Sequence, residues 1–164
     1  MNREATLTLL ARGGLDRADG VPQDELPQYS GLVDPSGVER LGCALARLAA
    51  STGADTVLVW EPPEDLVLAH VVARELGATV ARACETAGIV HMMDALPAGA
   101  RVLLLGDAFR RPAVLKGMTT VTRHHGAHVV GAAVLIETAA LAELGDLPVF
   151  SLLPIPADDG ADLS

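Results

Sequence analysis

Short, unbroken runs of apolar residues recur along the chain and alternate with longer segments whose apolar residues have helical spacing. The clearest runs are 56–60 and 102–105, and each lies between turn signals. Such runs are typical of strands that are buried on both faces of a parallel sheet. The same pattern predicts further strands over residues 78–83, 128–136 and 148–153, and a short strand within 87–93.

The segments between these runs predict helices over residues 2–12, 62–76 and 112–125. Another helix starts at Asp34 or Ser36, whose short polar side chains suit a helix cap, and ends at Gly53. Strands that alternate with helices of this length indicate an α/β fold, with a doubly wound parallel sheet flanked by helices.

The 164 residues are expected to form one domain. Residues 1–33 would supply an N-terminal helix and an irregular connection rich in Gly, Pro, Asp and Gln. Residues 155–164 read as a flexible acidic tail. Half of the residues are apolar but only one Trp, one Tyr and two Phe are present, so Ala, Val and Leu must build the core.

The net charge of −9 argues against nucleic-acid partners, because an acidic surface repels a phosphate backbone. No apolar run approaches the roughly 18 uncharged residues of a membrane span, and no segment has the pattern of a signal peptide. Cys43 and Cys84 lack any metal-binding or redox spacing and are expected to be reduced thiols. We therefore expect a cytoplasmic protein without a membrane partner.

Candidate site residues follow the predicted strands. Glu61, Gly106 and Asp107 stand at carboxyl ends of strands, where open α/β sheets bind ligands. Glu61, Glu64, Asp65 and Asp107 could converge at this edge as a metal site or a general acid/base pair, or they could be ordinary charges. The neighbouring Glu64 and Asp65 are more simply explained as charges that favour the start of a helix.

Other candidates are cationic or aromatic. Arg110, Arg111 and Lys116 form a basic cluster on an acidic protein, which suits either an anion site or a solvated helix start. His91 is the histidine that we would test as a catalytic base. Trp60 could stack on a planar ligand, or belong to the core or to a dimer interface.

Residues 101–131 contain a strand, a charged turn, a helix and a second strand, RVLLLGDAFRRPAVLKGMTTVTRHHGAHVVG. This layout resembles the ribose-phosphate site of type I phosphoribosyltransferases, in particular the adenine and xanthine branch. Similar stretches lie at residues 34–57, 66–79, 126–137 and 145–153. The resemblance implies a phosphoribosyltransferase-like fold, and it implies a homodimer.

The resembling family ends this strand with two adjacent acids, the first of which helps to hold the ribose hydroxyls. Here Gly106 takes the first position and Asp107 the second. The family's Ala-Thr-Gly-Gly-Thr phosphate loop corresponds to residues 110–114, Arg-Arg-Pro-Ala-Val. Pro112 has no N–H to donate and Val114 has no hydroxyl, so the motif for phosphoribosyl pyrophosphate is degenerate.

Two further elements of the family's site differ. Its first site loop corresponds to residues 61–65, where two prolines remove N–H donors and three carboxylates would repel pyrophosphate unless Mg²⁺ intervened. Its long mobile lid corresponds to the short segment between Ala83 and Arg101, which has no lysine.

The leading hypothesis is a phosphoribosyltransferase-like protein that has lost phosphoribosyl transfer. It would bind a small, anionic molecule or serve as a repurposed biosynthetic protein, without a cofactor. One alternative is an enzyme that uses Asp107, Glu61 and His91 for new acid/base chemistry. Another is an active purine-type phosphoribosyltransferase, which is the only case that calls for Mg²⁺.

Overall fold

One twisted sheet organises the molecule in the computed structural model, which describes residues 1–15, 25–61 and 64–155. Its order is β3-β2-β1-β4-β5-β6, and every neighbouring pair is parallel except β2 and β3. The strands are β1 (Thr56–Trp60), β2 (Thr79–Thr86), β3 (Ile89–Met92), β4 (Arg101–Gly106), β5 (His128–Ile136) and β6 (Val149–Leu153). The carboxyl ends of five strands therefore lie at one edge.

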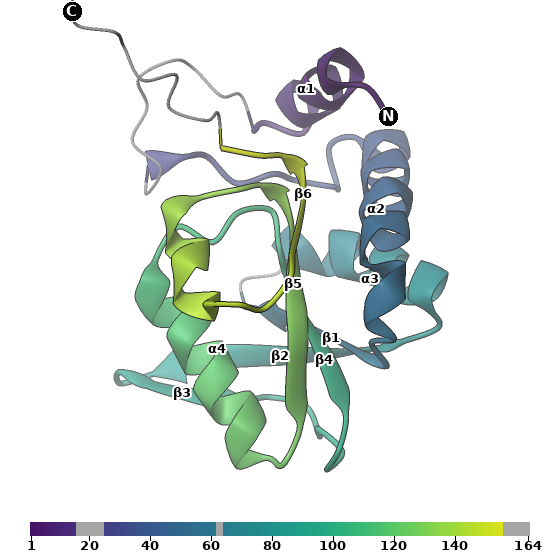
Figure 1. Ribbon diagram of the computed structural model, residues 1–164. Coiled ribbons are helices and arrows are strands. Elements are labelled where there is room, and N and C mark those ends of the chain that lie inside the picture. Colours follow the sequence, from purple (N-terminus) through teal and green to yellow (C-terminus); the bar gives the residue numbers. More distant parts are fainter. Residues whose placement is uncertain (16–24, 62–63, 156–164) are drawn as a thin grey trace, which may run out of the picture.

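Helices cover both faces of this sheet (Figure 1). On one face lie α2 (Pro35–Ala49) and α3 (Glu64–Leu76), and on the other lies α4 (Pro112–His124). The 3₁₀ segment η3 (Ala139–Leu144) packs beside α4, η2 (Ala50–Thr52) extends α2, and α1 (Arg3–Arg12) packs on α2. The arrangement confirms the predicted α/β fold with helices on both faces of the sheet, and the predicted parallel pairing holds for all strands except β3.

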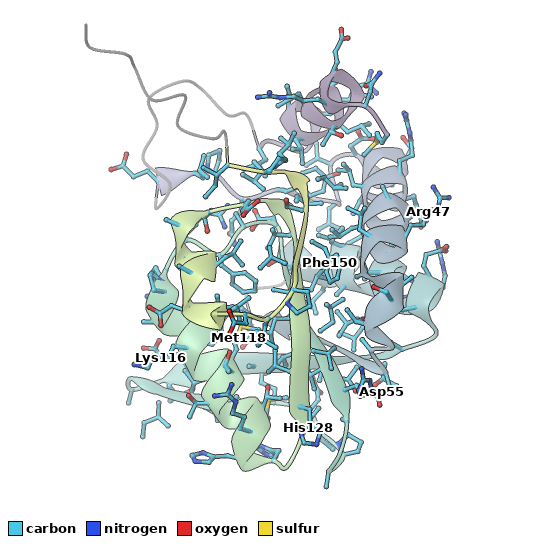
Figure 2. The ribbon with its side chains drawn as sticks, in the orientation of Figure 1. Arg47, Asp55, Lys116, Met118, His128 and Phe150 are labelled. Atoms are coloured by element: carbon cyan, nitrogen blue, oxygen red, sulfur yellow. The ribbon has the colours of Figure 1, made fainter. Side chains whose placement is uncertain are left out.

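The unbroken apolar run in β4 is explained by its central place in the sheet. Leu103 and Leu105 pack with α2 and α3, while Leu104 packs on the α4 side, and all three are fully buried. Figure 2 shows the same division on α4, where Met118 points toward the sheet and Lys116 points away from it. Successive side chains of β4 thus point to opposite faces of the sheet, where they pack into two separate hydrophobic cores.

Capping and close packing set the position of α2. The side chain of Asp34 accepts the N–H of Gly37 at 3.0 Å, as the sequence predicts for one of its two cap candidates. A Cβ atom at Gly42 would lie 2.5 Å from Cγ1 of Val71, so glycine allows α2 and α3 to approach. These contacts place the chain before α2 near the carboxyl edge of the sheet.

Several boundaries differ from those predicted. The segment 87–93 pairs antiparallel with β2 as a hairpin, and β2 extends to Thr86 because that pairing gives its last residues a partner. Pro62, Pro63, residues 16–24 of the connection and residues 156–164 of the predicted tail lie outside the described residues. No helix in the described part of the chain is long and apolar enough to cross a membrane.

Candidate functional site

A cleft of about 170 Å³ opens at the carboxyl edge of the sheet. It lies where β1 and β4 end and where α3 and α4 begin, with the connection before α2 on its rim. Its lining consists of Gln28, Trp60, Asp65, Gly106, Ala108, Phe109, Arg110, Arg111 and Val114. A larger hollow of about 440 Å³ beside α2 lies away from the strand ends, so we place the candidate site in the cleft.

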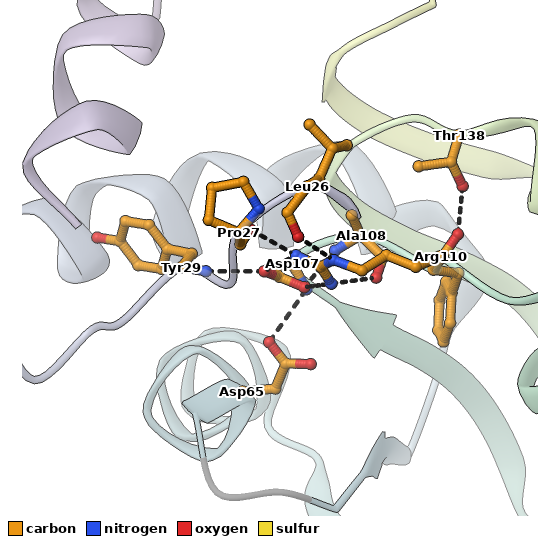
Figure 3. A network of polar contacts seen from close by, with 9 residues as sticks. Leu26, Pro27, Tyr29, Asp65, Asp107, Ala108, Arg110 and Thr138 are labelled. Carbon is orange, nitrogen blue, oxygen red and sulfur yellow. Dashed lines mark hydrogen bonds and ion pairs between the residues drawn. The ribbon is translucent and has the colours of Figure 1, made fainter. Parts of the chain in front are cut away.

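Asp107 lies beneath this cleft and is committed to contacts within the chain. Its side chain is 1% exposed and accepts the N–H groups of Tyr29 at 2.8 Å and Ala108 at 2.6 Å. Arg110 binds both carboxylate oxygens, each at 2.8 Å (Figure 3). Both oxygens of Asp107 are therefore occupied by groups of the protein itself.

Arg110 is committed to the same network. A guanidinium has five N–H donors. Two of them bind the Asp107 oxygens, and the others bind the carbonyl oxygens of Leu26, Pro27 and Ala108 at 2.7, 2.6 and 3.0 Å. In this conformation no N–H of Arg110 is left for a ligand.

The charge of Arg110 is secured by its surroundings. Burial acts to lower the pKa of this guanidinium, but the hydrogen bonds and charge of Asp107, with the charge of Asp65, outweigh it and raise the pKa above its ordinary value. Arg110 therefore remains a cation whose partner is the buried carboxylate of Asp107.

The turn that follows β4 is held from three further sides. The N–H of Asp107 donates to Asp65 of α3 at 3.1 Å, and its carbonyl oxygen accepts from Leu135 and Ile136 of β5. The hydroxyl of Thr138 donates to the carbonyl oxygen of Phe109. This dense bonding gives the floor of the cleft a fixed shape.

Comparison with known proteins identifies the architecture. No protein-family model and no curated protein sequence matches the chain. Solved structures do: adenine phosphoribosyltransferase from Rhodothermus marinus superposes with a TM-score of 0.69 at 20% identity, covering 94% of this chain and 100% of that one. The fold is that of the type I phosphoribosyltransferases.

Other proteins with this fold differ in what they bind. Orotate phosphoribosyltransferase from Aeropyrum pernix matches with a TM-score of 0.61 at 19% identity, over 76% of this chain and 75% of that one. A hypothetical protein from Neisseria gonorrhoeae, solved with bound ppGpp, matches with a TM-score of 0.57 at 17% identity, over 78% and 82%. The resemblance read from the sequence is thus confirmed for the fold.

The phosphoribosyltransferase fold brings only some of the predicted site residues together. Trp60, Gly106, Arg110 and Arg111 line the cleft, and Asp107 lies buried beside them. Lys116 instead lines a separate hollow between α4 and η3, so the predicted basic cluster is divided.

Two predicted catalytic groups also lie apart from the cleft lining. Glu61 is exposed, and its N–H donates to the carbonyl oxygen of Ala83 at 2.9 Å. His91 lies on β3, where its ring contacts Cys84. Neither Glu61 nor His91 is therefore among the residues that line the cleft, and their joint action with Asp107 stays a prediction.

Sequence analysis missed several residues of the lining. Gln28 comes from a connection with no regular pattern, so nothing in the sequence marked it. Phe109 is one of only two phenylalanines and directly precedes the two arginines, which is a signal that could have found it. Asp65 does more than stabilise a helix start, because it lines the cleft and binds the N–H of Asp107.

The cleft combines aromatic surface with one available cation. Phe109 is 4% exposed, Trp60 is half-buried, and Val114 adds apolar surface. The Arg111 side chain is exposed and makes no hydrogen bond or ion pair with any described residue. Such a site suits a small, flat molecule with a negative charge.

Proposed function

We propose that this protein binds a small planar anion in the cleft between Trp60, Phe109 and Arg111, and that it does not transfer phosphoribose. The observation that carries the proposal is the ion pair of Asp107 with Arg110. Of the two acids that the resembling family places after this strand, one is Gly106 here. The other, Asp107, has both oxygens bound within the protein.

The start of α4 supports the loss of a phosphate cradle. Arg111 caps this helix without a side-chain hydrogen bond, and Pro112 has no N–H. The N–H of Val114 donates to the carbonyl oxygen of Arg111 at 3.2 Å, and its side chain is buried. Two of the backbone donors expected in such a cradle are therefore absent or occupied.

The size of the cleft limits the ligand. Its volume of about 170 Å³ is below the roughly 300–1,000 Å³ of pockets for drug-sized ligands. A single flat ring system with a carboxylate or phosphate fits this space better than phosphoribosyl pyrophosphate together with a base. Trp60 and Phe109 would contact the ring, and Arg111 would bind the anionic group.

Magnesium does not fit the residues present. Mg²⁺ prefers several oxygen ligands in octahedral geometry. Asp65 is a single carboxylate in the cleft lining, Asp107 is occupied, and Glu61 lies outside the lining. The described residues contain no group of three or more His, Cys, Asp or Glu side chains that could hold a metal. The proposal therefore includes neither a metal nor a cofactor.

Trp60 offers a direct test, because it is the only tryptophan in the chain and it lines the cleft. Its fluorescence would be titrated with purine and pyrimidine bases, nucleoside monophosphates and aromatic carboxylates. We expect quenching or a spectral shift with at least one anionic member. Arg111→Ala should weaken that binding by about tenfold or more, as the loss of a charged hydrogen bond implies. Arg123→Ala, an exposed arginine at the far end of α4, should leave it unchanged.

Calorimetry with phosphoribosyl pyrophosphate and Mg²⁺ tests the proposal that the protein does not transfer phosphoribose. We expect no binding in the micromolar range. Micromolar binding would contradict the proposal and favour an active purine-type phosphoribosyltransferase.

The proposal extends to a cytoplasmic homodimer, in keeping with the resembling family. Leu32 and Val33 directly precede α2 and are 76% and 70% exposed, so apolar surface is present for such an association. Sedimentation at several protein concentrations would give the mass, and a monomer throughout would exclude the dimer.

A further inference from the structure

Cys84 and His91 face each other across the β2–β3 hairpin. They are a directly opposed pair in the antiparallel register, and Sγ of Cys84 lies 3.1 Å from Nε2 of His91. This distance is short for a contact that involves sulfur. The two side chains are therefore close enough to share the thiol proton.

The second ring nitrogen of His91 determines the direction of that sharing. Nδ1 lies 3.4 Å from the carbonyl oxygen of Ile89, which can only accept a hydrogen bond. In a neutral imidazole Nδ1 is then the protonated nitrogen, and Nε2 presents its lone pair to the thiol. His91 is thus oriented as a base toward Cys84, in the manner of a nucleophile–base pair.

The surroundings leave this pair available. His91 is exposed and Cys84 is half-buried, so the contact between them lies at the protein surface. Arg82, two residues before Cys84, interacts electrostatically with this cysteine and binds both oxygens of Asp94 at 2.8 and 3.0 Å. Glu61 interacts electrostatically with the same arginine. No described carboxylate forms an ion pair with His91.

We propose that Cys84 is a modification site: a thiol, activated by His91, that forms mixed disulfides with low-molecular-weight disulfides. Nε2 of His91 takes the thiol proton, and the sulfur of Cys84 attacks one sulfur of the reagent. The S–S bond of the reagent breaks as the new S–S bond forms. The leaving thiolate then takes the proton from His91, so that one disulfide and one thiol are consumed and one of each is produced.

Cys43 is a natural control within the same chain. It is half-buried like Cys84, but it lies on α2 and has no side-chain hydrogen bond among the described residues. Cys84 differs from it by the imidazole of His91 and by an electrostatic interaction with Arg82. The change of rate in a His91 variant therefore isolates the effect of the imidazole, and Cys43 gives the rate of a thiol that has no such neighbour.

The test uses the full chain with each cysteine alone, Cys43→Ser and Cys84→Ser, and the aromatic disulfide dithionitrobenzoate as the probe. We expect the thiol of Cys84 to react about tenfold faster than that of Cys43, since proton transfer to a neighbouring base generates the nucleophile. His91→Gln in the Cys43→Ser background should remove most of this advantage. Because His91 is exposed, the variant is expected to fold, and its circular dichroism spectrum would verify this.

Two further measurements make the outcome decisive. In concentrated urea the two thiols should react at similar rates, because the pairing across the hairpin is lost. Incubation with glutathione disulfide, followed by peptide mass mapping, should place the adduct on Cys84 in preference to Cys43. Equal rates in the folded protein, an unchanged rate in His91→Gln, or a preference that persists in urea would each overturn the proposal.

Discussion

Arg110 binds both oxygens of Asp107 three residues away, and with its other donors it holds the backbone of residues 26 and 27. One arginine therefore joins the turn after β4 to the connection that precedes α2. The pair is largely withdrawn from water, because the side chains of Asp107 and Arg110 are 1% and 16% exposed. An intact buried ion pair of this kind can add little net stability. Removing one partner is nevertheless strongly destabilising, because it leaves the other charge buried and uncompensated.

Arg110→Ala should therefore destabilise the fold strongly. It leaves the carboxylate of Asp107 buried without its cation, and such losses cost about 3–5 kcal/mol. Urea unfolding followed by circular dichroism gives the free energy of unfolding. The neighbouring Arg111→Ala is the matched control, and it should change this free energy by less than about 0.5 kcal/mol because its side chain is exposed and unpaired among the described residues.

A double variant distinguishes the pair from general packing. Asp107→Asn combined with Arg110→Ala should cost less than the sum of the two single changes, since the second change removes the charge that the first left uncompensated. Additive effects would contradict the account of Asp107 and Arg110 as one coupled unit.

The fold was predictable because its signals are local. Leu103, Leu104 and Leu105 mark a strand with two buried faces, and Asp34 marks a helix start, so each element could be identified within a few residues. The candidate site was less predictable. The acceptors of Arg110 include carbonyl oxygens 83 and 84 residues away, in a connection whose composition carries no periodic pattern.

The position of Lys116 also depends on the fold rather than on distance along the sequence. Arg110, Arg111 and Lys116 are close in sequence, but α4 begins between them. The rotation of the helix directs Lys116 toward the hollow shared with η3 rather than toward the cleft. The segment that carries His91 could be predicted as a strand. The contact of His91 with Cys84 could not, because it depends on the antiparallel register of β3 with β2.

Tyr29 provides a test of burial in the connection before α2. Its ring is 1% exposed, and burial, assisted by the charge of Asp34, raises the pKa of its phenol from 10.0 to about 12. Because the folded pKa lies above the unfolded one, this group's contribution to stability is complete below about pH 10 and is lost as the pH rises toward 12.

Phenolate absorbance measures this directly, since the chain has a single tyrosine. We expect a midpoint near 12 in the folded protein and near 10 in urea. Tyr29→Phe should abolish the absorbance change. A folded protein that titrates near 10 would show that Tyr29 is accessible to water.

The Arg82–Asp94 pair predicts the behaviour at acid pH. The hydrogen bonds from Arg82, opposed by burial and aided by the arginine's charge, hold the pKa of Asp94 below its ordinary value. A lowered folded pKa means that the contribution is present above the unfolded value of about 4 and is lost as the pH falls below it. Asp94→Asn should thus lower the urea midpoint at neutral pH and lower it less at about pH 3. A shift of equal size at both pH values would contradict this assignment.

Gly117 fixes how the β2–β3 hairpin packs on α4. A Cβ atom at this position would lie 2.5 Å from Cγ2 of Val90 and 3.3 Å from its Cβ, so the branched side chain of Val90 fills the space over the glycine. In an exposed helix Gly→Ala would stabilise by up to about 1 kcal/mol. Here the clash of the new Cβ with Val90 should dominate. Overpacking of this kind costs about 1–3 kcal/mol of the free energy of unfolding, and the helix gain offsets only part of that cost.

Val90→Ala in the Gly117→Ala background should recover much of the loss, because it removes the methyl groups that the new Cβ would meet. Thermal unfolding of the four proteins in this cycle gives the coupling between the two positions. The same cycle bears on Cys84 and His91, since moving Val90 away from α4 also moves the strand that carries His91. The rate of the Cys84 thiol can therefore be compared in Gly117→Ala and in the double variant with Val90→Ala. A rate that changes in the first and returns to normal in the second would connect the packing of the hairpin to the geometry of Cys84 and His91. A Gly117→Ala protein that is more stable than the original would show instead that the hairpin does not depend on this contact.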